Sequence, residues 1–404
     1  MPTRIAIVFL LLLTAASAVA AEPPEFLLVE TTPVETEGLD DPAIPQAHEQ
    51  WLDMIDGARK EILVASFYFS DDPDDPDDRL DRVLAALTRA ADRGVSVRLL
   101  SDAGFHKTYP DIPDRFAELY GCESRLLDAR ALWGGVQHAK YMVVDGRDAY
   151  LGSQNWDWRA LTHIRELGVR LRHTELARAL RDVFLLDWAL AGDEERPKTA
   201  ADAGPYELTT DELGPVRVAL GASPIKALPA GVPWDLPQLT RLVRDAEKTL
   251  DLQMLSYHPT DRDGDEWLGL DTELRQAAAR GVKVRLIVSN WAKSRSQLPW
   301  LKSLACVPGL EVRFTNIPEW SGGFVPFARV EHPKYLVVDG VRGWVGTSNW
   351  GPDYFSASRN VGVIVEGEGV AEQLAAFFAR GWDGPYAEVL DPGRNDYEPP
   401  ARDR

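Results

Sequence analysis

Two stretches of the sequence decide the fold: residues 138–155, which read HAKYMVVDGRDAYLGSQN, and residues 332–349, which read HPKYLVVDGVRGWVGTSN. Each stretch carries a histidine, a lysine, an aspartate, a glycine, a hydroxyl residue and an asparagine at the same spacing. A duplication of this kind predicts two related halves within one chain. The matched side chains are His138, Lys140, Asp145, Ser153 and Asn155 in the first stretch, and His332, Lys334, Asp339, Thr347 and Asn349 in the second.

The Asp-Gly pair in the middle of each stretch predicts a β-hairpin. Folding the chain there sets His138 opposite position 154, and the second hairpin repeats this pairing. Because residues two apart share one face of a strand, each hairpin gathers an imidazole, an ammonium, a carboxamide and a hydroxyl group at one end. We therefore expect Asp145 and Asp339 to serve the turns, and the other matched residues to form a chemical site.

The rest of each half is repeated as well, for example GVSVRLL at 94–100 and GVKVRLI at 281–287. We expect an α/β protein of two pseudo-symmetric halves, each a mixed sheet flanked by helices, with the active site at their interface. The Pro-, Gly- and acid-rich stretch 192–235 is predicted to connect the halves. Periodicity predicts a strand, a helix and a strand in each half, at 61–69, 80–93 and 95–100 and again at 249–257, 266–280 and 282–288.

The charge balance limits the partners of the protein. Its 404 residues carry 44 Lys and Arg against 63 Asp and Glu, a net charge of −19. Such a field repels phosphates, so tight binding of duplex DNA is not expected, although a local basic site for one phosphodiester is compatible with it. Two cysteines, Cys122 and Cys306, are too few for a disulfide framework, and the sequence leaves open whether they pair with each other.

The N-terminus predicts export. Residues 1–21 combine a basic start, an apolar run and a small-residue site, which is typical of a cleavable signal peptide. An uncleaved membrane anchor is the alternative. No later segment is long and apolar enough to span a membrane, so the mature chain is predicted to be periplasmic or extracellular. Within it we expect one half at 22–203 and the other at 204–404.

Two facing clusters of this composition suit a phosphodiester. A neutral imidazole can attack phosphorus and give a phosphohistidine, while a protonated imidazole donates to the leaving oxygen. Lys140, Lys334, Asn155 and Asn349 can hold the non-bridging oxygens, where charge builds up in the transition state. Because the lysines supply the positive charge, we expect neither a metal nor another cofactor.

The doubled His-x-Lys…Asp…Gly-Ser/Thr-x-Asn pattern resembles the motif of the phospholipase D superfamily. Further stretches resemble the branch of lysosomal 5′-exonucleases that are also called phospholipases D, among them ASFY at 65–68, YLGS at 150–153 and GTSNW at 346–350. The resemblance spans nearly the whole mature chain, and it implies the phospholipase D fold.

For individual residues, the resemblance implies that His138 and His332 are the nucleophile and the general acid, without fixing which is which. It implies phosphate binding by the two lysines and two asparagines, with Ser153 and Thr347 assisting. Glu166 is predicted to orient a catalytic imidazole, because a carboxylate fixes the tautomer of a histidine. The matching position of the second half is Asn360, so the halves differ there.

The resemblance favours a 5′-to-3′ exonuclease that acts on single-stranded nucleic acid with a free 5′-hydroxyl end and releases nucleoside 3′-phosphates. One alternative is a phospholipase D or transphosphatidylase that acts on phospholipid head groups through the same residues. A second alternative is a catalytically silent protein that binds lipid or nucleic acid.

Other residues give weaker signals. Tyr68 and His258 end equivalent strands, where the sites of α/β proteins collect, and they are candidates for the substrate cleft. The acidic run 71–78 lacks the spacing and the glycine of an EF-hand. It predicts a solvated loop rather than a calcium site.

Overall fold

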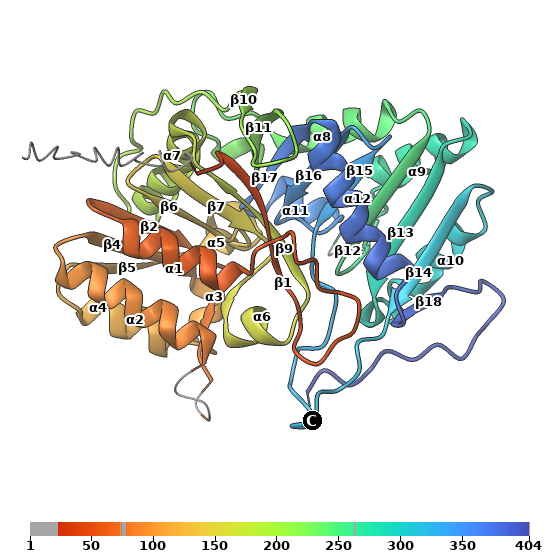
Figure 1. Ribbon diagram of the computed structural model, residues 1–404, viewed down its shortest axis with the longest axis horizontal. Helices are drawn as coiled ribbons and strands as arrows, with labels where there is room; N and C mark the ends of the chain where they lie inside the picture. The colour runs from red at the N-terminus through yellow and green to blue at the C-terminus, as the bar shows by residue number, and fades with distance from the viewer. Residues whose placement is uncertain (1–22, 73, 75–77, 262–263, 404) are drawn as a thin grey trace, which may run out of the picture.

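The computed structural model describes residues 23–72, 74, 78–261 and 264–403. In this part of the chain the strands form a seven-stranded sheet, a nine-stranded sheet and a two-stranded ribbon (Figure 1). The predicted signal peptide, 1–21, lies outside the described residues. Among the described residues, no helix is long and apolar enough to cross a membrane.

The first sheet has the strand order β1-β9-β7-β6-β2-β4-β5. Strands β2, β4 and β5 run parallel, while β1, β9, β7 and β6 pair with their neighbours antiparallel, so the sheet is mixed. The strands are β1 (Phe26–Thr31), β2 (Glu61–Ala65), β4 (Ser96–Asp102), β5 (Cys122–Leu127), β6 (Tyr141–Val144), β7 (Asp148–Gly152) and β9 (Glu166–Leu171). The ribbon pairs β3 (Phe69–Ser70) with β8 (Trp156–Asp157).

The second sheet repeats this order in its strands β11-β17-β16-β15-β12-β13-β14 and adds β10 and β18 at its edges. Its strands are β10 (Tyr206–Leu208), β11 (Val216–Ser223), β12 (Thr249–Met254), β13 (Lys283–Ser289), β14 (Leu310–Thr315), β15 (Tyr335–Val338), β16 (Arg342–Gly346), β17 (Asn360–Glu366) and β18 (Ala387–Val389). The repeated order is the structural counterpart of the repeated sequence, and it bears out the prediction of two mixed sheets.

Helices cover both sheets and fill the space between them. One core cluster joins apolar residues of both sheets with α7 and α12, while α1 and α2 pack on the first sheet and α8 and α9 on the second. Figure 1 shows α1, α2 and α4 on the outer side of the first half and α9 and α10 on that of the second. The helices are α1 (Ala47–Gly57), α2 (Arg79–Asp92), α3 (Ala103–His106), α4 (Asp111–Glu118), α5 (Ala129–Trp133), α6 (Trp158–Thr162), α7 (Thr174–Ala191), α8 (Asp235–Arg244), α9 (Gly269–Ala279), α10 (Leu298–Ala305), α11 (Pro352–Ser356) and α12 (Glu368–Trp382), with short 3-10 helices η1 (Ile225–Ala227) and η2 (Asn290–Lys293).

The two predicted hairpins are confirmed. Strands β6 and β7 pair antiparallel around Asp145-Gly146, and β15 and β16 pair around Asp339-Gly340. Both central residues of each turn have positive φ, 53° and 63° in the first and 55° and 69° in the second, which is the geometry of a type I′ turn. The carboxylate of Asp145 also accepts hydrogen bonds from the backbone N–H groups of residues 59–61, and Asp339 does the same for residues 247–249. Each aspartate thereby ties its hairpin to the start of a parallel strand.

The stretch 192–235, which is predicted to connect the halves, also contributes strands to the second sheet. Strand β11 lies in this stretch, inside the second sheet between β10 and β17. Its residues alternate between buried and more exposed positions at first and are all buried toward its end, because it occupies the place that β1 holds in the first sheet. The predicted strand 61–69 also ends early, at Ala65, because the Ser66 hydroxyl donates to the carbonyl of Tyr68 at 2.7 Å and turns the chain.

Candidate active site

The hairpins bring both sets of motif residues to the boundary between the halves. Lys140 and Lys334 are fully buried, while His138 and His332 keep 6% and 7% of their surfaces exposed. Asn155 and Asn349 are buried beside them. The two histidines thus keep a small exposed fraction at the boundary, whereas the lysines keep none.

Each histidine is held by a strand of the opposite half. The backbone N–H of His138 donates to the carbonyl of Arg359 at 3.0 Å, and that of His332 donates to the carbonyl of Arg165 at 2.9 Å. Arg165 directly precedes β9, and Arg359 directly precedes β17. Each half thus holds the backbone of the other half's histidine in place.

Two fully buried arginines form ion pairs across the same boundary. Arg165 pairs with Glu331 at 3.0 Å across the boundary, and Arg359 pairs with Asp187 at 2.6 Å across it in the other direction. Arg359 also donates to the carbonyl groups of Ser223 and Ala227, and Arg165 to that of Phe377. Sequence reasoning missed both arginines, although an arginine stands before Glu166 and before Asn360 alike. This repeated arginine is the sequence signal that could have identified them.

His332 faces a carboxylate. Its Nδ1 lies 2.7 Å from Glu166 Oε2 and 2.9 Å from Oε1. Burial raises the pKa of Glu166 to about 7, against the opposing charges of Lys334 and Lys140. Burial, with the same two lysines, lowers the pKa of His332 well below its usual value. Both shifts favour the neutral forms, which are a protonated Glu166 carboxyl and an uncharged His332 imidazole. Around neutral pH the two side chains therefore share a single acidic proton.

His138 faces an amide instead. Its Nδ1 lies 3.0 Å from Asn360 Oδ1, which also accepts from the Thr347 hydroxyl at 2.9 Å. The Asn360 amide nitrogen donates to the carbonyl of Tyr354 at 2.8 Å, which fixes the oxygen toward His138. Nδ1 must therefore carry the hydrogen, and Nε2 keeps its lone pair. Burial, then Lys140 and Lys334, lower the pKa of His138 well below its usual value, so this imidazole is neutral.

The lysines supply positive charge beside both imidazoles. Each Nζ donates to the carbonyl of the histidine two residues before it. Burial lowers the pKa of Lys334 to about 7 and that of Lys140 well below its usual value. An anion bound between them favours the charged ammonium forms, so these side chains are suited to hold the oxygens of a phosphodiester.

Ser153 and Thr347 brace the residues that orient the histidines. The Ser153 hydroxyl donates to the carbonyl of Leu167 and accepts from the N–H of the same residue, next to Glu166 on β9. Thr347 accepts the equivalent bond from the N–H of Val361, next to Asn360 on β17, while its own hydrogen goes to Asn360 Oδ1 at 2.9 Å. These hydroxyl groups therefore position β9 and β17 where they cross the site.

The two cleft candidates fall in different surroundings. The Tyr68 hydroxyl donates to Asp157 at 2.9 Å and accepts from the amide nitrogen of Asn155 at 3.4 Å, so Tyr68 joins the motif. His258 lies beside Trp350, the residue after Asn349, and its backbone N–H donates to that carbonyl at 3.1 Å. Asp157 is in turn ion-paired with Arg159. Tyr68 therefore connects Asn155 to a buried charge pair.

Two further sequence features lie outside the site. Cys122 is buried and Cys306 is exposed, and both are free. In the acidic run 71–78, residues 73 and 75–77 lie outside the described residues. Carboxylate oxygens of Asp71, Asp78 and, beyond the run, Asp81 come within 4.8 Å of one another, on the surface of the first half.

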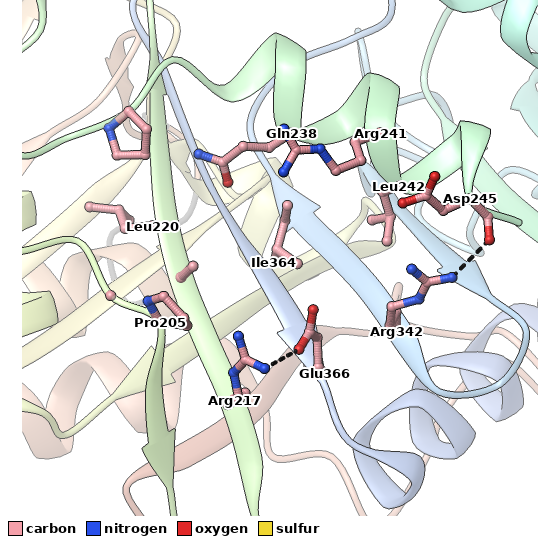
Figure 2. Close-up of a pocket in the computed structure, with 13 residues that line it drawn as sticks. Pro205, Arg217, Leu220, Gln238, Arg241, Leu242, Asp245, Arg342, Ile364 and Glu366 are labelled. Carbon is pink, nitrogen blue, oxygen red and sulfur yellow. Dashed lines mark hydrogen bonds and ion pairs between the residues drawn. The ribbon is translucent and has the colours of Figure 1, made fainter.

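A cavity of about 340 Å³ opens elsewhere, between α8 and the strands β11, β16 and β17 (Figure 2). Arg217 pairs there with Glu366, and Arg241 and Arg342 also line it. Glu366 ends β17, whereas Asn360 begins it. Glu366 of the cavity thus lies at the other end of β17 from Asn360, which contacts His138, and residues of the cavity serve as controls for the site.

Comparison with known proteins agrees with the duplicated architecture. The family described as "Cardiolipin synthase, PLD-like domain" matches residues 51–188 and again residues 239–382. The chain is 32% identical to the bovine protein named 5′-3′ exonuclease PLD3, over 92% of this chain and 81% of that one. It is 30% identical to the mouse protein named 5′-3′ exonuclease PLD4, over 91% and 80%. It is 27% identical to a probable phospholipase D of Caenorhabditis elegans, over 90% and 70%.

Solved structures share the fold. The phosphatidylserine synthase of Haemophilus influenzae superposes with a TM-score of 0.61 at 14% identity, covering 85% of each chain. The polyphosphate kinase of Porphyromonas gingivalis gives a TM-score of 0.58 at 12% identity, covering 93% of this chain and 51% of that one. Together with the two family matches, the likeness confirms the predicted fold, one unit in each half.

Proposed function

Because the chain belongs to the phospholipase D superfamily and is a phosphodiesterase, we propose that it removes nucleotides from the 5′-hydroxyl end of single-stranded nucleic acid and releases nucleoside 3′-phosphates. One observation carries this proposal: relatives that match nine-tenths of the chain at 30–32% identity are named 5′-3′ exonucleases. The net charge of −19 fits an enzyme that holds one phosphodiester at a time rather than a duplex.

In the first step we assign His138 as the nucleophile. Its Nε2 lone pair is supported by the bond from Nδ1–H to Asn360. It attacks phosphorus, the bond from phosphorus to the 5′-oxygen breaks, and His332 gives its proton to that oxygen. The product is a phosphohistidine that carries the 5′-terminal nucleoside through its 3′-oxygen, while the shortened strand leaves with a new 5′-hydroxyl end.

In the second step His332 acts as a base. It takes a proton from water as the water oxygen attacks phosphorus, and the bond from phosphorus to His138 Nε2 breaks. A nucleoside 3′-phosphate leaves, and both imidazoles return to their starting forms. Glu166 beside His332 Nδ1 supports this alternation, since a carboxylate stabilises the imidazolium. Lys140, Lys334 and the two asparagines hold the non-bridging oxygens in both steps.

A phospholipid substrate is the second candidate, because one relative is named a probable phospholipase D. The test offers the protein, in EDTA, three substrates: a 5′-hydroxyl oligonucleotide, the same strand phosphorylated at its 5′ end, and a phosphatidyl lipid. Products are identified by mass. Nucleoside 3′-phosphates from the 5′-hydroxyl strand alone are expected. Release of head group with intact oligonucleotides contradicts the proposal and favours the lipid.

The matched variants for this test are His138→Ala and His332→Ala, with Arg241→Ala as control. The histidine variants are expected to lose activity on whichever diester the protein cleaves. Arg241 lines the cavity of Figure 2, so its loss removes one positive charge far from the site and should leave the rate unchanged. Activity restored only by a divalent metal after EDTA contradicts the metal-independent chemistry.

We further propose that the protein is exported after removal of residues 1–21, on the composition of that segment. Expression in a cell with a secretion pathway, followed by mass measurement of the exported protein, tests this. A mature start near residue 22 supports it, and an intact N-terminus retained in the membrane fraction contradicts it.

A further inference from the structure

Four aromatic side chains gather beside one of the two histidines. Phe67 and Tyr68 follow β2, and Phe105 and Tyr109 lie on α3 and the turn after it. The rings of Phe67 and Phe105 have centroids 4.1 Å apart, and Tyr68 stacks on Tyr109 at 4.8 Å with planes 21° apart. Phe67, Phe105 and Tyr109 are half-buried, so part of each ring meets solvent. We call these three residues the aromatic shelf.

The shelf is continuous with the site. The Phe67 ring lies 5.2 Å from the His138 ring, and the Lys140 ammonium lies 5.2 Å from the Phe67 ring. Asp102 joins the two parts rigidly, because its carboxylate accepts from the N–H of Gly104 at 2.9 Å and from that of Gln137 at 2.6 Å. The helix that carries Phe105 and the hairpin that carries His138 are thus held by one side chain.

The second half lacks such a shelf at the equivalent positions. Ser289 caps Trp291 as Asp102 caps Gly104, which makes Ala292 the counterpart of Phe105. The counterpart of Phe67 is Tyr257, whose hydroxyl is buried and donates to Asp271 at 2.7 Å. At these two equivalent positions the second half thus has an alanine and a tyrosine with a buried hydroxyl, while Trp291 of the same turn packs against Phe327 and Arg402.

We propose that the aromatic shelf is a nucleobase subsite that stacks the base of the 5′-terminal nucleotide, the one retained on His138. This proposal rests on the proposed function. In an in-line displacement the leaving 5′-oxygen departs on the side opposite the attacking nitrogen, toward His332. The strand that leaves therefore extends away from His138, whereas the retained nucleoside stays bonded through phosphorus to the histidine that the shelf flanks. Flat, partly exposed rings beside a cation bind bases with little sequence preference.

The test is a cycle of two variants and two substrates. The protein and Phe105→Leu, which keeps apolar volume but has no flat ring, are given a 5′-hydroxyl oligonucleotide and the same strand with an abasic first residue. Loss of the base or of the ring should each lower kcat/KM about 5- to 150-fold, the range of one stacked base. On the abasic strand, Phe105→Leu should cost nothing further, because the ring then has no base to stack.

Three controls make the result decisive. Phe105→Tyr keeps the ring and should restore the wild-type rate, a strand abasic at its third residue should respond little to Phe105→Leu, and Tyr120→Ala removes an aromatic that is 94% exposed elsewhere. If the two losses simply multiply in an active wild type, the subsite is overturned while the exonuclease stands. If the wild type cleaves no oligonucleotide but hydrolyses a phosphatidyl lipid, the proposed function itself fails, and the subsite fails with it.

Discussion

Glu166 of the first half lies 2.7 Å from Nδ1 of His332 in the second half. Its counterpart Asn360 of the second half lies 3.0 Å from Nδ1 of His138 in the first. The two imidazoles share the same motif and the same burial, yet one faces an acid and the other an amide. This difference gives His332, and not His138, a partner that can share a proton, and several predictions rest on it.

The roles of the two histidines can be separated by the leaving group. On an oligonucleotide, His138→Ala and His332→Ala should each lower kcat/KM by at least about 10²- to 10⁴-fold. On a nucleoside 3′-(p-nitrophenyl phosphate), whose leaving group needs no proton, His332→Ala should recover most of the rate while His138→Ala stays inactive. Release of p-nitrophenol measures both. Recovery in His138→Ala instead would exchange the two assignments.

The rate should fall as pH rises above about 7. The Glu166–His332 pair must hold its proton to act as the acid, and burial raises the pKa of Glu166 to about 7. Above that value the rate should drop about tenfold per pH unit. Below it the rate should persist, because the pKa of His138 is well below 6.5 and the nucleophile stays neutral. A profile of kcat/KM against pH tests this; a rate that still rises through pH 8 contradicts it.

Glu166→Gln should lower kcat/KM on oligonucleotides about 10²- to 10⁴-fold, because an amide cannot share the proton that His332 delivers. The same variant should lose much less on the p-nitrophenyl substrate. Equal losses on both substrates would mean that Glu166 serves only the fold. Far-ultraviolet circular dichroism and an unfolding curve confirm that the variant is folded.

Asn360→Asp should shift the loss of activity at acidic pH to a higher pH. A carboxylate 3.0 Å from Nδ1 raises the pKa of His138 and protonates the nitrogen that attacks phosphorus. The variant should be least active at acidic pH and recover toward neutral pH, the reverse of the wild type. An unchanged profile shape would show that Asn360 does not set the protonation of His138.

Arg359→Leu should destabilise the protein by about 3–5 kcal/mol, because it leaves Asp187 buried without its partner. The double variant Arg359→Leu with Asp187→Leu removes both charges and should recover a large part of the loss. Denaturant unfolding of the two variants measures the difference. A double variant as unstable as the single one would show that the bonds of Arg359 to Ser223 and Ala227 matter more than the ion pair.

Much of this site could be predicted from the sequence because it is local. The hairpin turn, the pairing of His138 with position 154 and the gathering of lysine and asparagine at one end follow from residues within eighteen positions of each other. Glu166 was identified through the resemblance, but the histidine that it contacts was not. The residues near Glu166 in the sequence do not show which imidazole lies beside the start of β9.

Contacts between the halves could not be predicted in this way. The pairs Arg165–Glu331 and Arg359–Asp187 join residues 166 and 172 positions apart. Strand β11 was missed because its window is rich in Pro, Gly and acids, and its assignment depends on a neighbour, β17, that lies far along the chain. The aromatic shelf depends likewise on the packing of α3 against the end of β2, which periodicity does not report.

Because each half supplies the neighbours of the other half's histidine, the two histidines of one chain need not have the same neighbours. In an assembly of two identical halves, both imidazoles would meet the same residue, because one gene would encode both neighbours. Joining the halves in one polypeptide removes that constraint, since the codon for Glu166 and the codon for Asn360 can then mutate separately. A single chain thus allows the two positions to differ, as the carboxylate of Glu166 and the amide of Asn360 do.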